Sequence, residues 1–90
     1  METTKKIIKM RIDGIALLNQ VNGLYQLKLP SEIIHLGYDS EGDVLNAHFK
    51  VNPEVIDSEI VEEDENVILG LDKDEKIVRI TILNASKYEW

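Results

Sequence analysis

The sequence predicts a mainly β fold: a small antiparallel sheet of hairpins with little or no helix, the alternative being an α+β fold with a short helix at one end. Apolar and polar residues alternate in several short segments between residues 34 and 83, which places each apolar set on one face of a pleated strand. Acidic or glycine-containing turns separate these segments, as in hairpins. Such a sheet has one buried apolar face and one polar face. The same residues specify a fold but no reaction.

The N-terminal region is the least regular part of this pattern. Residues Lys6–Asp13 alternate between apolar and polar side chains, which predicts a strand. The competing interpretation is an amphipathic helix over Thr4–Gln20, which Gly14 would interrupt. The alternation favours the strand.

Two dipeptides further along, Asp13-Gly14 and Asn22-Gly23, accept positive φ and are candidate hairpin turns. Between them, Ile15–Gln20 is a candidate short strand. Residues Tyr25–Leu29 alternate again and predict another strand, which Pro30 ends because proline has no N–H to donate to a ladder.

The central hairpin carries the clearest signal. Ile34–Tyr38 leads into the acidic turn Asp39–Asp43, and Val44–Phe49 leads out of it. We therefore expect Ser31–Leu36 to be extended and to pair with the strand after Gly42.

A second hairpin follows in the C-terminal half. Val67–Leu83 contains two alternating segments around the turn Asp72–Glu75. The acidic segment Glu54–Asp64 before it predicts a solvated loop with a short edge strand, since charges along an edge discourage pairing with other sheets. The tail Ala85–Trp90 is too short to assign.

Composition sets the broad class. Ninety residues predict one domain, of which residues 1–26 are a basic N-terminal strand or arm and residues 27–87 a β core. The absence of cysteine excludes disulfides and thiolate metal sites. No apolar run approaches the length of a membrane span and no signal pattern begins the chain, so we expect a soluble, cytoplasmic protein without a membrane partner.

The net charge of −7 is unevenly distributed. Residues 1–30 sum to +3 and residues 31–90 therefore to −10. The acidic part should repel nucleic acid, so no nucleic-acid partner is expected, while the basic arm is suited to an acidic surface.

A spaced set of residues resembles the domain of unknown function 2283 family. The resemblance covers roughly residues 27–87 and rests on Leu27-Lys28-Leu29-Pro30, Tyr38-Asp39, Asp43-Val44-Leu45, Phe49, Asp57-Ser58-Glu59, Glu63, Val67, Ile80-Thr81-Ile82-Leu83 and Ala85-Ser86-Lys87. Asn46 departs from the family's usual aromatic, and Gly70 and Arg79 depart from its commoner Asp and Gly. The resemblance implies a small β-rich domain with no established activity or catalytic residues, and an association of some members with toxin–antitoxin pairs.

A second, shorter resemblance points to a different function. Leu29–Ile33, followed by Leu36-Gly37 and Gly42-Asp43, is similar to the swapped-hairpin DNA-binding domain of antitoxins and transition-state repressors. That family implies a short helix after the proline and basic arms that grip phosphates. The match ends near Phe49, and Gly23 lies too far from Pro30 for the family's spacing. The first resemblance also explains the C-terminal half, so we favour it.

Two places in the sequence carry residue types that ligate metals. Asp39, Glu41 and Asp43 resemble the start of a calcium loop, but Val44 and Lys50 stand where the loop needs Gly and Glu. A turn capped by Asp side chains explains the same residues.

His35 and His48 fall on outward phases of neighbouring strands and would ligate zinc only with an added Asp or Glu. Exposed polar positions are the simpler interpretation. We therefore predict no metal and no cofactor.

Catalysis has little support in the sequence. Its serines lack a nucleophile-elbow context, and no glycine-rich phosphate loop is present. A small hydrolase using the polar face of His48, Asn46 and Arg79 is the enzymatic alternative. We predict no enzyme and no catalytic residue, and an interaction surface that contains His48, Asn46, Arg79 and Ile68.

The predicted function is a non-catalytic protein-binding module that acts as a homodimer and, as an antitoxin-like protein, binds another small protein. The alternative is a DNA-binding regulator or antitoxin of the swapped-hairpin type. The dimer is predicted because strand alternation places four apolar residues on the face of the sheet away from the core. They are Ile33, Val44, Ile68 and Ile77. A second copy would remove such a patch from water.

Overall fold

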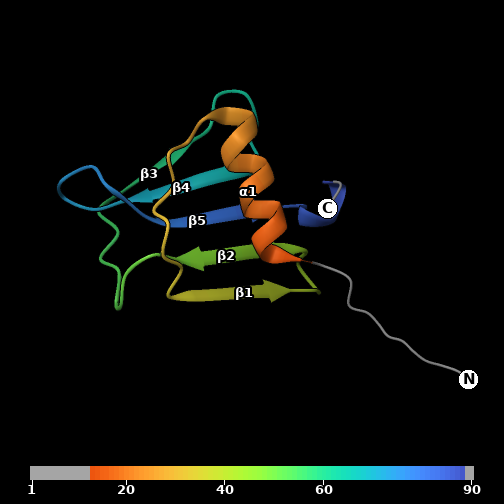
Figure 1. The fold of residues 1–90 in the computed structure, drawn as a ribbon, viewed down its shortest axis with the longest axis horizontal. Helices are drawn as coiled ribbons and strands as arrows, with labels where there is room; N and C mark the ends of the chain where they lie inside the picture. Colours follow the sequence, from red (N-terminus) through yellow and green to blue (C-terminus); the bar gives the residue numbers. More distant parts are fainter. Residues whose placement is uncertain (1–12, 89–90) are drawn as a thin grey trace, which may run out of the picture.

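The computed structural model describes residues 13–88, which form a five-stranded antiparallel sheet with one α-helix packed on it (Figure 1). The elements in chain order are α1 (Gly14–Tyr25), β1 (His35–Asp39), β2 (Val44–His48), β3 (Asp57–Ile60), β4 (Val67–Leu71), β5 (Ile77–Leu83) and the 3₁₀ turn η2 (Ala85–Lys87). Their spatial order in the sheet is β1-β2-β5-β4-β3. The fold is therefore mainly β with one short helix, as predicted. The strand expected over Lys6–Asp13 lies outside the described residues, except for Asp13.

Helix α1 replaces the short strand predicted at Ile15–Gln20, and that prediction was wrong. Asp13 has extended backbone (φ −102°) and its Oδ1 accepts the Ala16 N–H at 3.1 Å, so it caps the helix. The Asp13-Gly14 dipeptide thus begins a helix rather than a hairpin, and Asn22-Gly23 lies inside it. The buried residues Leu17, Leu18 and Val21 have helical spacing and face the sheet.

The segment after the helix has no regular structure and pairs with no strand, so the strand predicted at Tyr25–Leu29 was also wrong. Gln26 ends the helix in the left-handed region (φ 53°). Leu27 and Leu29 are partly buried against the core while Lys28 is exposed, as the alternation predicted. The amide oxygen of Asn22 accepts the Leu29 N–H at 3.1 Å and ties this segment back to the helix.

Both hairpins and the edge strand are confirmed. β1 pairs with β2, β4 with β5, and the short β3 lies at the edge beside β4. Residues 31–34 form no helix, and the Ile34 N–H donates to the His48 carbonyl at 2.9 Å just before β1 begins. The helix that the DNA-binding resemblance implies after Pro30 is therefore not formed.

The core lies between α1 and one face of the sheet. Its fully buried side chains include Leu17, Leu45, Ile80 and Ile82, and Ile33 and Ile77 pack against it. The last two were predicted on the outer face. For Ile77 the cause is a β-bulge: Gly70 pairs with Arg79 but Leu71 pairs with Ile77, which skips Val78 and returns Ile77 to the core side. None of the helices within residues 13–88 is long and apolar enough to cross a membrane.

Candidate interaction surface on the helix-free face

The face of the sheet opposite α1, the helix-free face, carries two aligned rows of side chains. Residues on this face alternate along each strand with the core residues, and the register fixes which of them are neighbours. One row reads His35, His48, Arg79, Gly70 and Ser58 across all five strands, and the next reads Gly37, Asn46, Thr81, Ile68 and Ile60. The four residues predicted as an interaction surface, His48, Asn46, Arg79 and Ile68, therefore all lie on this one face.

One end of the face, over β1, β2 and β5, is polar. The rings of His35 and His48 lie side by side, with centroids 5.5 Å apart. They line a shallow depression of about 520 Å³ together with Gly37, Asn46 and Arg79. Asn46 Oδ1 accepts the Thr81 hydroxyl at 2.6 Å, so this amide is held in place. We call His35, Gly37, Asn46, His48 and Arg79 the polar corner.

The other end of the face, over β4 and β3, is apolar. Ile68 lies opposite Ile60, whose side chain is 57% exposed, and Ile56 just before β3 is 61% exposed. Val44 and Leu83 form a second apolar pair where β2 meets β5. Helix α1 covers the other face of the sheet (Figure 1), so it shields none of these side chains.

The acidic turn between β1 and β2 is held by its own carboxylates. Asp39 Oδ1 accepts the N–H groups of Glu41 and Gly42 at 3.0 and 3.3 Å. This is the capped turn that the sequence predicted in place of a calcium loop. Within residues 13–88, no group of three or more histidine, aspartate or glutamate residues is placed to hold a metal ion.

Asp43 joins this turn to the end of the chain. Its carboxylate accepts the Ser86 hydroxyl at 2.6 Å and the Tyr38 hydroxyl at 2.6 Å, as well as the Ser86 N–H. The hydrogen bonds from Ser86 and then from Tyr38 lower the pKa of Asp43 because they stabilise its ionised form. Tyr38, Asp43 and Ser86, all part of the family-like pattern, thus have a structural role.

A second carboxylate, Asp64, organises a cluster that sequence reasoning missed. It accepts the Tyr25 hydroxyl at 2.9 Å, the Tyr88 hydroxyl and the Asn66 N–H at 3.0 Å. Burial raises the pKa of Asp64, but these hydrogen bonds outweigh it and hold the pKa below its usual value. Burial and the bond to Asp64 raise the pKa of Tyr88. The partners lie 39 and 24 residues away in the chain, so no local pattern could reveal them.

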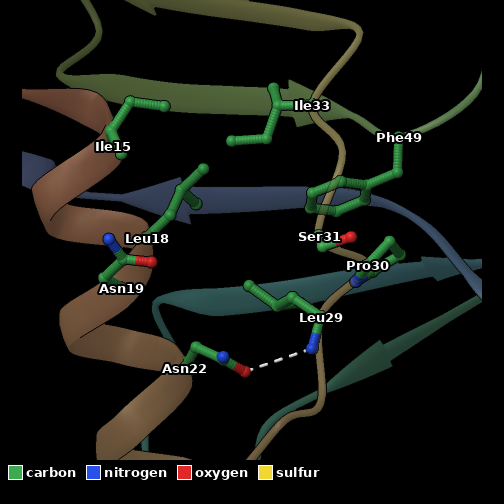
Figure 2. A pocket seen from close by; sticks show the side chains of 9 residues that line it. All are labelled: Ile15, Leu18, Asn19, Asn22, Leu29, Pro30, Ser31, Ile33 and Phe49. Carbon is green, nitrogen blue, oxygen red and sulfur yellow. Dashed lines mark hydrogen bonds between the residues drawn. The ribbon is translucent and has the colours of Figure 1, made fainter.

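A separate pocket of about 600 Å³ lies between α1 and residues 29–33 (Figure 2). Ile15, Leu18, Ile33 and Phe49 form its apolar walls, and the Asn22 amide that lines it is bound to the Leu29 N–H. No charged side chain lines this pocket, which therefore contains no general acid or base.

The helix-free face does not bring a serine close to His48, as the hydrolase alternative would require. Ser58 is the serine in the row of His48, but Arg79 and Gly70 stand between them. Three strand spacings separate the two residues by about 14 Å, far beyond hydrogen-bond reach. The described residues thus show no enzyme-like arrangement on this surface.

Comparison with known proteins gives one match. The family model described as "Protein of unknown function (DUF2283)" matches residues 35–86, which span all five strands and the start of η2 and leave α1 outside. No curated protein and no solved structure matches the chain.

Proposed function

Because the chain belongs to the DUF2283 family of proteins of unknown function, its role must be sought in its own surface, and we propose that it is a non-catalytic protein-binding module that forms a homodimer through the helix-free face. The observation that carries this proposal is the apolar area formed by Ile60 and Ile68 beside the polar corner. Protein interfaces combine an apolar part, which is buried, with polar groups that remain closer to solvent.

The size of the domain supports a second copy as the partner. A chain of this length buries a smaller share of its surface than larger domains do, so an added interface contributes substantially to its stability. The single layer of helix covers only one face of the sheet, which leaves the other face available for a second copy. Two copies packed face to face would form a sandwich with twofold symmetry, the commonest symmetry of homo-oligomers.

The polar corner would orient the two copies. The side chain of Arg79 makes no hydrogen bond or ion pair with another residue of the 13–88 range, so its guanidinium can pair across an interface. A different small protein, such as a toxin partner, would compete with the second copy for the same face. An exposed apolar area beside polar residues marks an interaction site, and a second copy would bring the same apolar area to it.

Sedimentation equilibrium at about 100 μM protein tests the proposal. We expect a dimer for the unmodified protein and a monomer for Ile68→Asp, since an unpaired carboxylate is costly at a buried site. Ile60→Asp, on the exposed edge strand, is a second variant in case Ile68→Asp fails to fold. Leu24→Asp is the matched control, because Leu24 is 59% exposed but lies on α1. A monomeric unmodified protein, or a dimer lost only in the Leu24 variant, would refute the interface.

A further inference from the structure

The two histidines of the chain, the only ones in its sequence, are direct neighbours on the helix-free face. His35 of β1 and His48 of β2 are register partners, with ring centroids 5.5 Å apart and the ring planes tilted by 36°. His35 is exposed and His48 half-buried. Two imidazoles at such spacing form a potential pair of metal ligands.

The separation of the rings matches binding of one tetrahedral ion. Metal–nitrogen bonds of about 2.0–2.1 Å at a tetrahedral angle place two imidazole centroids about 5 Å apart. No hydrogen bond within residues 13–88 occupies the ring nitrogens of either histidine. A Cβ at position 37 would lie 3.3 Å from His35 Nε2, so the glycine there leaves this nitrogen uncovered.

Within residues 13–88, no third histidine, aspartate or glutamate is placed to join the pair as a metal ligand. Asp39 Oδ1 is used by the turn and Asn46 Oδ1 by the Thr81 hydroxyl. Arg79 pairs with His48 in the ladder, but its Nε lies 3.3 Å from the Cβ position of Gly70, so the side chain leans toward β4 and away from His35. Within the described residues the two imidazoles are therefore half of a tetrahedral ligand set.

We propose that His35 and His48 bind a divalent transition-metal ion of the zinc class, and that the same pair from a second copy completes the tetrahedron. The inference rests on the proposed dimer: a twofold interface uses the same surface of both copies, and a residue pair that lies on the twofold axis meets its own equivalent there. Imidazole is a preferred ligand of zinc, nickel and copper. Each chain carries a net charge of −7, so a cation at the interface also offsets repulsion between two acidic copies.

Zinc titration of untagged, metal-free protein by calorimetry gives the first readout. We expect one zinc per two chains. His35→Gln and His48→Gln should each weaken binding at least about tenfold, since loss of even an outer-shell partner of a ligand costs about 10–100-fold in metal affinity. Leu24→Gln is the control: Leu24 is 59% exposed on α1, away from the helix-free face, so the variant keeps both imidazoles and the proposed interface and should retain the stoichiometry. Zinc binding that neither histidine variant weakens would overturn the site.

Sedimentation equilibrium with and without zinc separates this inference from the proposed function. Zinc that strengthens dimerisation of the unmodified protein, but not of the histidine variants, supports the shared ion. A dimer that forms equally well without zinc, and binds either none or one ion per chain, overturns the shared site and leaves the proposed dimer intact. A monomer under both conditions overturns both. If a histidine variant fails to fold, the zinc stoichiometry of the unmodified protein still decides between these outcomes.

Discussion

The side chain of Arg79 lies across Gly70, its partner in the ladder between β4 and β5. A Cβ built on Gly70 would come within 3.2 Å of Arg79 Cβ and 3.3 Å of Arg79 Nε, and within 3.2 Å of Val55 Cγ2. The absence of a side chain at position 70 makes room for the arginine.

Gly70→Ala should therefore destabilise the protein by about 1–3 kcal/mol, the usual cost of overpacking. Chemical denaturation of the variant measures this loss. Gly23→Ala is the matched control: no atom lies within 4 Å of its Cβ position, and the helix should gain roughly 0.5–1 kcal/mol.

The double variant Gly70→Ala/Arg79→Ala tests the pairing itself. Shortening Arg79 frees space for the new methyl group, so we expect a coupling free energy of about 0.5–3 kcal/mol in the double-mutant cycle. Recovery should be partial because Val55 also adjoins this position. Strict additivity of the two substitutions would show that Arg79 does not restrict position 70.

The Asp64 cluster predicts a loss of stability at alkaline pH. Burial and the bond to Asp64 raise the pKa of Tyr88 and of Tyr25 above the ordinary 10.0. Because folding raises the pKa of these tyrosines, their contribution to the free energy of unfolding is complete below pH 10. It is lost as pH rises through the raised pKa of the folded protein. We expect Tyr88→Phe to lower the melting temperature at pH 7, and the difference from the unmodified protein to shrink above pH 10. A constant difference would contradict this linkage.

The lowered pKa of Asp43 predicts a loss of stability at acidic pH. The pKa of Asp43 in the folded protein lies below the ordinary 3.8. Its contribution to the free energy of unfolding is therefore complete above about pH 4 and is lost as pH falls through the lowered value. Asp43→Asn should therefore reduce stability at pH 7 and matter less near pH 2 to 3. Asp43→Ala should cost more than Asp43→Asn, because φ is 57° here and asparagine tolerates the left-handed region. Thermal unfolding across this pH range measures both effects, and equal costs would contradict the backbone argument.

Duplex DNA should not bind usefully. Fifteen carboxylates in residues 31–90 oppose five lysines and arginines, and phosphate contacts supply most non-specific affinity. Fluorescence anisotropy in ~0.15 M salt, where screening acts beyond about 8 Å, should stay flat below ~10 μM protein, within the usual range of non-specific binding. Saturation at submicromolar protein would instead support the DNA-binding alternative.

Strand alternation located most of the sheet, because β2, β4 and β5 each have one face of buried residues and one more open face. It identified both hairpins, while the acidic turn and the edge strand were predicted from their charged residues. It failed for Ile77, since a bulge reverses the phase of a strand and leaves no mark in a short apolar run. It also placed His48, Asn46, Arg79 and Ile68 on one face, although their role stays a prediction.

The helix was missed because two signals competed in a short segment. Asp13-Gly14 suits a tight turn but also suits a helix start, where Asp caps the first turn. Leu17, Leu18 and Val21 carry the helical spacing that distinguishes the two. The Asp64 cluster had no signal of this kind, because its partners meet only in the folded chain.

An isotope-filtered NOE experiment on mixed dimers of labelled and unlabelled chains tests the proposed interface most directly. Only protons that lie within a few ångströms of each other across the interface give a signal in this experiment. We predict intermolecular NOEs to the methyl groups of Ile60 and Ile68, and none to Leu24 on α1. Intermolecular NOEs confined to the α1 side, or none at a concentration where sedimentation shows a dimer, would contradict pairing through the helix-free face.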